Sequence, residues 1–252
     1  MLIDEIRTLI EDERIPVWGS SPAMKMANEP PGFQPEVLLP GARSMLCFGT
    51  PLPRAVYRVP VYGLETVWRA QNLNYRRLDT LSIQFAALLE ANGEQAFPIF
   101  GCYPLEINKS GDVAGYLNLI RMGAEVGIGV VGKNGLLINS RYGARLMMGG
   151  VITTATLPEI RYPMVDEPGC PPGCRICEDA CPARAISAED KRVDIMSCLA
   201  YTARTPLMSR LKFFLYRILR HKSAARLLNL TSFDEHTFHV CSQCVALCPY
   251  GD

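Results

Sequence analysis

The sequence predicts an α+β protein in which a mixed helix and strand domain, residues 1–160, precedes a small cysteine-rich domain, residues 161–252. Helical and strand-like patterns alternate through the first domain. Eight of the ten cysteines lie beyond residue 160. Between the two parts, the stretch LPEIRYPMVDEPG at 157–169 contains prolines and a Pro-Gly pair, which interrupt regular structure. These observations place the domain boundary near residue 160.

The elements of the first domain follow from hydrophobic periodicity. The first residues, MLIDEIRTLIEDERIPVWG, predict an acidic amphipathic helix. Further along the chain, the pattern predicts a buried strand at 42–52, an amphipathic helix at 74–93 that ends at a glycine cap, a short strand at 96–100 and a glycine-containing strand at 146–157. A core of this size is consistent with an enzyme of 252 residues.

The composition and the start of the chain indicate in which cellular compartment the protein lies and which classes of partner it binds. The chain start lacks the basic and apolar regions of a signal peptide, and no run reaches the roughly 18 apolar residues of a spanning helix. We therefore expect a cytoplasmic protein without a transmembrane segment, in a compartment where disulfides are rare. The formal net charge of +1 does not by itself call for a nucleic acid or an anionic membrane as a partner.

The cysteines of the second domain form two similar runs. Residues 170–182, CPPGCRICEDACP, have the pattern C-x3-C-x2-C-x3-C-P, and residues 241–249, CSQCVALCP, have the pattern C-x2-C-x3-C-P. In bacterial ferredoxins the last cysteine of each run binds the cluster of the other run. The spacing therefore predicts two [4Fe–4S] clusters, whose ligands are Cys170, Cys174, Cys177 and Cys248 for the first and Cys181, Cys198, Cys241 and Cys244 for the second.

Zinc is the alternative to iron–sulfur clusters, because soft thiolates bind both. Zinc sites usually consist of paired C-x2-C knuckles, whereas the C-x3-C-P step occurs twice here in the same relative place. That repetition favours clusters. Cys170 is the weakest of the predicted ligands, since Pro171, Pro172 and Gly173 make its spacing one residue longer than the usual C-x2-C.

The segment GAEVGIGVVGKNGLLINSRYGARLMMGGVITTATLP, residues 123–158, together with the cysteine runs, resembles the corresponding region of the epoxyqueuosine reductases. Weaker similarity extends upstream to ARSMLCF and to the helix at 74–93. The resemblance implies a nitroreductase-like α/β domain followed by a bacterial ferredoxin-like domain, a plan shared with reductive dehalogenases. It also implies a cobalamin-dependent reductase whose clusters pass single electrons to the corrinoid, with flavin as the alternative cofactor. The substrate would be a small molecule or a modified nucleoside.

The resemblance also suggests residues for the reaction site. The cofactor-binding candidates match family signatures and are Tyr75, Gly127, Gly129, Gly132 and Lys133. We expect the glycines to let the backbone approach a flat macrocycle, and the alternative is a structural glycine-rich turn. They do not form a dinucleotide fingerprint, because no strand-to-helix turn with a following acidic residue surrounds them. Asp112 is the candidate proton donor, since a carboxyl group in a dry pocket has a raised pKa; the alternative is an ordinary Ser-Gly-Asp turn.

The segment at 209–226 predicts a basic amphipathic helix, because it contains six Lys and Arg residues and no acidic residue. It could receive an external electron donor of the ferredoxin or flavodoxin type, lie on an anionic membrane, or pack on the cluster domain. The chain ends at Asp252 without a helical-repeat tail, which leads us to expect that transfer RNA is not the substrate. A second hypothesis for the whole protein is an electron-transfer or reductive-activation partner with no substrate chemistry.

Overall fold

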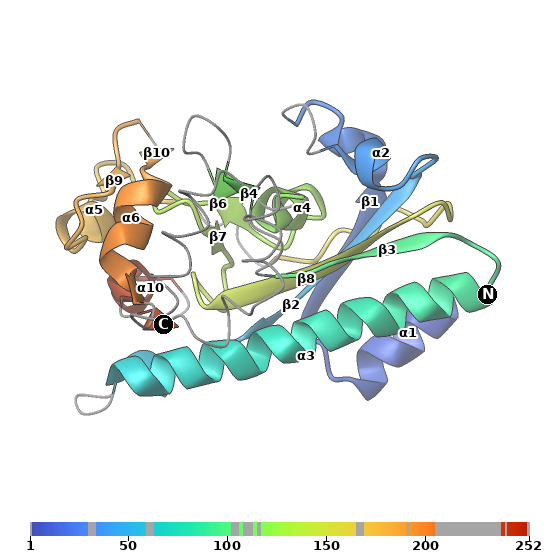
Figure 1. Ribbon diagram of the computed structural model, residues 1–252, viewed down its shortest axis with the longest axis horizontal. Coiled ribbons are helices and arrows are strands. Elements are labelled where there is room, and N and C mark those ends of the chain that lie inside the picture. The colour runs from blue at the N-terminus through green and yellow to red at the C-terminus, as the bar shows by residue number, and fades with distance from the viewer. Residues whose placement is uncertain are drawn as a thin grey trace, which may run out of the picture.

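The computed structural model describes residues 2–29, 34–58, 63–101, 106–107, 113–114, 117–164, 169–190, 192–204, 238–239 and 241–250 (Figure 1). Asp112, Cys102 and the basic segment at 209–226 lie outside the described residues. None of the helices in the described part of the chain combines the length and the hydropathy needed to cross a bilayer.

An antiparallel sheet forms the centre of the N-terminal half, with the strand order β1-β2-β8-β3. The strands are β1 (Val17–Pro22), β2 (Ser44–Pro51), β3 (Ala96–Ile99) and β8 (Leu146–Thr153). Cys47 in the second strand lies opposite Gly19 on one side and Gly150 on the other. The predicted strands at 42–52, 96–100 and 146–157 are therefore confirmed, whereas the prediction omitted β1.

Helices cover both faces of this sheet. On one face lie α1 (Leu2–Asp12) and α3 (Gly63–Ala91), and on the other lies α4 (Leu119–Glu125) with the short hairpin of β6 (Val130–Val131) and β7 (Leu137–Ile138) (Figure 1). Alternate residues of β2 consequently enter two cores: Leu46 and Phe48 pack with α1 and α3, and Met45 and Cys47 pack with α4. Burial on both faces explains why these strands read as continuous apolar runs.

The long helix α3 confirms the helix predicted at 74–93 and begins earlier than predicted, at Gly63. Its end agrees with the predicted glycine cap, since Gly93 follows the helix with a φ of +83°. Phe85 and Leu89 are fully buried on its inner face. At the first residue of the helix, Gly63, an added Cβ would meet no atom within 4 Å.

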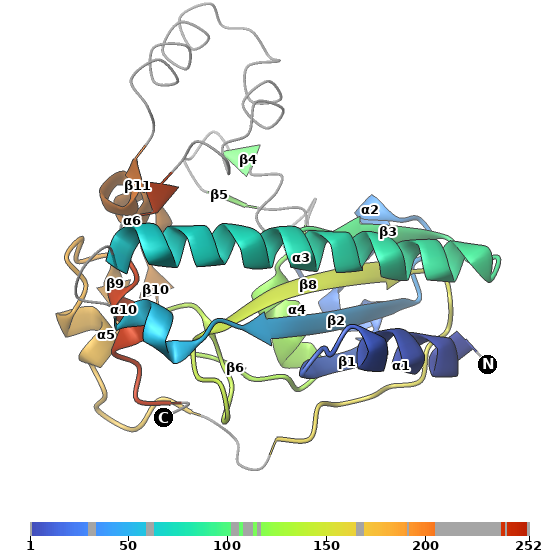
Figure 2. The ribbon, with the colours of Figure 1, turned by 90° about the horizontal axis from the view of Figure 1, so that it is seen from below.

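The cysteine-rich segment lies at one end of α3, away from the N-terminus (Figure 2). Its regular elements are short: α5 (Ile176–Asp179), β9 (Ile186–Ser187), β10 (Arg192–Val193), α6 (Ile195–Thr202), β11 (Ala203–Arg204), β12 (Phe238–His239) and α10 (Gln243–Ala246). The remaining short elements are η1 (Ala23–Met26), α2 (Pro35–Leu38), η2 (Arg54–Tyr57), β4 (Glu106–Ile107) and β5 (Val113–Ala114). Mixed helix and sheet content agrees with the predicted α+β class.

Candidate functional site: two sets of cysteines

Four cysteines from two distant segments line one cavity. They are Cys170, Cys174 and Cys177 from the first run and Cys248 from the end of the second. The other residues that line this cavity are Asn134, Ile138, Pro171, Ile176, Pro249 and Tyr250. Burial raises the pKa of the Cys248 thiol, and the negative charges of Cys170 and Cys174 raise it further. The four thiols that the sequence assigns to the first cluster thus lie together.

The other four cysteines also lie near one another. Burial raises the pKa of Cys198, with further increases from the charges of Cys181 and Cys241. Burial likewise raises the pKa of Cys244 to about 12, and Cys241 and Cys198 again contribute. Thiols with raised pKa values are protonated at neutral pH, so metal binding at these sites would release protons.

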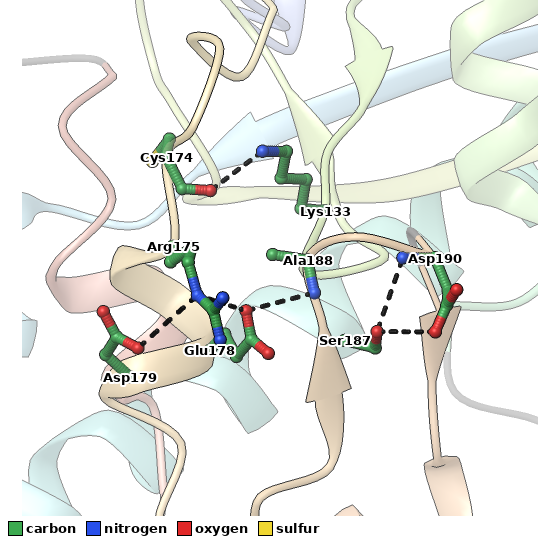
Figure 3. Close-up of polar contacts among 8 residues, drawn as sticks. All are labelled: Lys133, Cys174, Arg175, Glu178, Asp179, Ser187, Ala188 and Asp190. Carbon is green, nitrogen blue, oxygen red and sulfur yellow. Dashed lines mark hydrogen bonds and ion pairs between the residues drawn. The ribbon is translucent and has the colours of Figure 1, made fainter.

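The helix α5 contains Cys177 of the first set, and Cys181 of the second set lies two residues after its end. Within it, the Glu178 carboxylate accepts a hydrogen bond from the Ala188 amide at 3.3 Å and pairs with Arg175 Nε at 3.1 Å (Figure 3). Because the Arg175 side chain is 60% exposed, the ion pair contributes little to stability. The contact with Ala188 attaches α5 to the chain beyond β9 and so orients Cys177 and Cys181 relative to each other.

Cys198 lies on α6, which starts at an aspartate. The Asp194 carboxylate accepts hydrogen bonds from the Ser197 amide at 3.0 Å and from its hydroxyl at 2.6 Å, which caps the helix. Thr202 Oγ1 donates to the Cys198 carbonyl at 2.9 Å in the last turn. The short helix α6 therefore carries the isolated Cys198.

A tight turn accommodates the extra residue in the first run. The Cys174 amide donates to the Pro171 carbonyl at 3.0 Å, Pro172 follows, and Gly173 has a φ of +74°. Proline followed by a glycine with positive φ is the signature of a type II turn. The turn shortens the path from Cys170 to Cys174, so Cys170 reaches the cavity despite its longer spacing.

We expect Gly173→Ala to reduce the iron content of the reconstituted chain. Alanine in this left-handed conformation costs about 1–2 kcal/mol, which would open the turn and move Cys170. Iron analysis and thermal unfolding would measure both effects. Gly169→Ala is the matched control, because both positions have open space for a Cβ and only Gly173 has a positive φ. Equal iron contents in the two variants would show that the turn does not position Cys170.

None of the nine described cysteines forms a disulfide. Cys47 is fully buried in β2, and its burial raises its pKa, which agrees with the interpretation of this residue as a small apolar core side chain. Within the described ranges, no group of three or more His, Cys, Asp or Glu side chains has the geometry of a site for a single metal ion.

The predicted glycine-rich segment connects α4 to the β6–β7 hairpin. Gly127 follows the helix with a φ of +75°. A Cβ on Gly129 would lie 2.5 Å from the Ile138 carbonyl oxygen, and one on Gly132 would lie 2.7 Å from Ile138 Cγ1. The close approach at these two glycines is therefore to the opposing strand of the same hairpin. This arrangement supports the alternative interpretation of the segment as a structural turn.

Lys133 contacts the cysteine-rich segment. Its Nζ donates to the Cys174 carbonyl at 2.9 Å (Figure 3). Its amide donates to Cys170 Sγ at 3.4 Å. Asn134, which the sequence interpretation did not include, is buried and donates through Nδ2 to the Cys244 carbonyl at 3.3 Å. The hairpin turn thus touches both cysteine sets.

Tyr75 lies elsewhere. It is on α3, where its ring fits against the backbone of Gly101, and it packs against the core between the sheet and the α1–α3 layer. Its neighbour Asn74 exchanges two hydrogen bonds with Thr50 of β2, at 2.8 and 3.3 Å. The hairpin packs on the opposite face through Leu137. The sheet therefore separates Tyr75 from the other predicted cofactor-binding residues.

A second residue that the sequence interpretation missed is Tyr57. Burial raises its pKa, a hydrogen bond with Gln71 and the charge of Arg145 oppose that increase, and the charge of Cys244 adds to it. This tyrosine ends η2, which contacts α10. No motif or hydrophobic periodicity marks Tyr57 in the sequence. Only the tertiary structure reveals that it lies near Cys244 of the second cysteine set.

No protein-family model matches the chain. Among curated proteins, the epoxyqueuosine reductase of Lactococcus garvieae is 35% identical over 89 residues, 34% of this chain and 23% of that protein. The Bacillus cereus epoxyqueuosine reductase is 26% identical over 223 residues, 85% and 50% of the two chains. A tetrachloroethene reductive dehalogenase of Desulfitobacterium hafniense is 30% identical over 138 residues, which are 52% of this chain and 22% of that protein. The chain spans half or less of the length of each of these relatives.

Solved structures share the fold. The epoxyqueuosine reductase of Streptococcus thermophilus superposes with a TM-score of 0.56 at 18% identity, covering 100% of this chain and 66% of that one. An epoxyqueuosine reductase crystallised with an epoxyqueuosine-modified tRNA stem loop gives a TM-score of 0.55 at 16% identity with the same coverage. Sequence similarity to two groups of reductases thus coincides with a common fold over the whole chain. The chain is therefore similar in sequence to the epoxyqueuosine reductases and to the reductive dehalogenases, and it shares the fold of the solved epoxyqueuosine reductases.

Proposed function

We propose that this protein is an iron–sulfur reductase of the epoxyqueuosine reductase-like kind that holds two [4Fe–4S] clusters. The observation that carries the proposal is the gathering of eight thiols into two sets of four, one of which lines a cavity. Each set draws on both cysteine runs, as the bacterial ferredoxin arrangement requires. The donor set consists of soft thiolates, and backbone amides donate to two of the sulfurs, Cys170 and Cys181. The residues present therefore fit clusters.

We further propose that residues 161–252 act as a ferredoxin-like domain that supplies electrons to a nitroreductase-like domain formed by residues 1–160. An external donor of the ferredoxin or flavodoxin type would deliver the electrons, with the basic segment at 209–226 as its contact region. Related proteins support this plan, because an epoxyqueuosine reductase matches 85% of the chain and a reductive dehalogenase matches 52% of it.

The cofactor that would accept these electrons is proposed to be a corrinoid, with flavin as the alternative. The described candidates do not line one common binding site. Ile138 occupies the space at Gly129 and Gly132, and Lys133 is bonded to Cys174. The sheet separates Tyr75 from these residues. We therefore derive no reaction step through a corrinoid. When bound, a corrinoid would supply low-potential one-electron and two-electron chemistry at its metal.

Asp112 remains the proposed proton donor, and the proposed substrate is a small molecule or a modified nucleoside. The expectation against transfer RNA has no support from the comparisons, because a protein of the same fold was crystallised with a tRNA stem loop. A modified nucleoside within RNA therefore belongs among the substrates to be assayed.

Reconstitution without oxygen tests the proposal. Chain purified anaerobically and supplied with iron and sulfide is expected to bind about eight irons, since each cubane cluster holds four. Added cobalamin is expected to change the corrinoid absorption spectrum. Asp112→Asn should keep both properties and lose turnover. Eight irons with no response to a corrinoid or a flavin would instead indicate an electron-transfer partner. Zinc in place of iron would refute the cluster assignment.

A further inference from the structure

We propose that Lys133 sets the reduction potential of the first cluster, held by Cys170, Cys174, Cys177 and Cys248, and is a positioning residue for electron transfer. This inference rests on the proposed cluster and deepens it, because it assigns to the sheet-bearing half of the chain a role in controlling the redox properties of the cysteine-rich half. In this proposal the glycine-rich turn affects the reduction potential of a cluster, whereas the sequence resemblance suggested that it binds the corrinoid.

Two contacts of Lys133 point to this role. Both involve residues of the same cysteine set. The amide reaches Cys170 Sγ at 3.4 Å. The Nζ reaches the Cys174 carbonyl at 2.9 Å (Figure 3). The second bond holds the ammonium group against the loop that carries three of the four thiols. The residue is half-buried, so solvent screens its charge less than that of an exposed lysine.

The backbone of the hairpin holds Lys133 in this place. The Gly132 amide donates to the Leu136 carbonyl at 2.8 Å, and the Gly135 amide donates to the Gly132 carbonyl at 2.9 Å, which closes the turn. Asn134 Oδ1 accepts from the Leu136 amide at 3.1 Å while Nδ2 binds the Cys244 carbonyl. The turn is thus attached to the cysteine-rich segment at Lys133 and at its neighbour Asn134.

Each set has a backbone amide that donates to a cysteine sulfur, but among the residues that the structure describes only the first set has a lysine contact of this kind. In the second set, the Ala185 amide donates to Cys181 Sγ at 3.3 Å, which corresponds to the bond from Lys133 to Cys170. Hydrogen bonds to cluster sulfurs and nearby charges both alter reduction potential. Reduction adds one negative charge to a cluster, so a fixed ammonium nearby stabilises the reduced form. The effect of Lys133 should therefore fall mainly on the first cluster.

The test is an anaerobic redox titration of the full reconstituted chain, followed by electron paramagnetic resonance. Lys133→Met is expected to disfavour reduction of one cluster by about tenfold, which equals about 59 mV for a one-electron couple. The other cluster should keep its potential and serve as an internal reference. Lys133→Arg should restore the original potential, and Lys133→Gln, which keeps a donor without the charge, should behave like Lys133→Met. Lys25→Met is the matched control, since that lysine pairs with Glu159.

An unchanged potential in Lys133→Met with full iron content would overturn the inference. Retention of the original potential in Lys133→Gln would overturn the electrostatic role, because the hydrogen bond alone would then suffice. If Lys133→Met loses iron, the comparison between the Gln and Arg variants decides the matter, since both keep a donor and only arginine keeps the charge. Absence of iron from the unmodified chain would refute the proposed clusters, a result distinct from failure of the Lys133 inference.

Discussion

The double variant Cys181→Ala/Cys198→Ala is expected to retain one cluster, with about four irons per chain where the unmodified protein holds about eight. Cys181 belongs to the first run by sequence, but its charge acts on Cys198, which lies between the runs. If both bind the second cluster, removing both thiols costs no more iron than removing either one. Iron analysis and resonance spectra of the anaerobic protein would measure the result.

The matched control is Cys177→Ala/Cys198→Ala, which removes one ligand from each proposed set and should lose both clusters. In the described arrangement Cys177 lines the cavity with Cys248. If each cysteine run instead bound its own cluster, the Cys181/Cys198 variant would damage both sites and lose nearly all of its iron. That outcome would contradict the exchange of ligands between runs.

Gly129→Ala is expected to destabilise the protein by about 1–3 kcal/mol, the range for overpacking in a well-packed core. The added methyl group would meet the Ile138 carbonyl oxygen at 2.5 Å, and that oxygen belongs to the strand paired with β6. Backbone atoms of a paired strand cannot rotate away as a side chain can. The thermal midpoint should fall by about 2–4 °C for each kcal/mol lost, as measured by anaerobic thermal unfolding.

Two further variants calibrate this prediction. Gly132→Ala should cost less, because the atoms nearest to the added methyl group belong to the side chains of Ile138 and Asn134 and not to the backbone of a paired strand. Gly63→Ala is the control, since its added methyl group would have open space at the start of α3. A Gly129→Ala protein with normal stability that failed to bind a corrinoid would show that the glycine serves the cofactor, and our structural account of the segment would be wrong.

The secondary structure of the sheet-bearing half was largely predictable. The strand at 42–52 and the helix at 74–93 have periodicities that depend on local burial, and the structure confirms both. The strand β1 was missed because its first three residues were included in the helical pattern at 1–19, and because Val17–Pro22 contains glycine, two serines and a terminal proline, which are weak strand formers. It is stabilised by pairing with β2 along its whole length, a long-range contact that no local pattern records.

The sequence by itself determined which cysteines are candidate ligands and limited the proposed chemistry to thiolate-bound clusters or zinc, because the spacing of cysteines limits which metals and clusters a loop can bind. Only the tertiary structure decided where the other candidates lie. The match to a glycine and lysine signature could not show that Ile138 fills the space at Gly129, or that Lys133 bonds to Cys174. Nor could it show that the sheet separates Tyr75 from that turn. The physical reason is that ligand spacing is a property of a short chain segment, whereas the surroundings of a side chain depend on which distant segments pack against it.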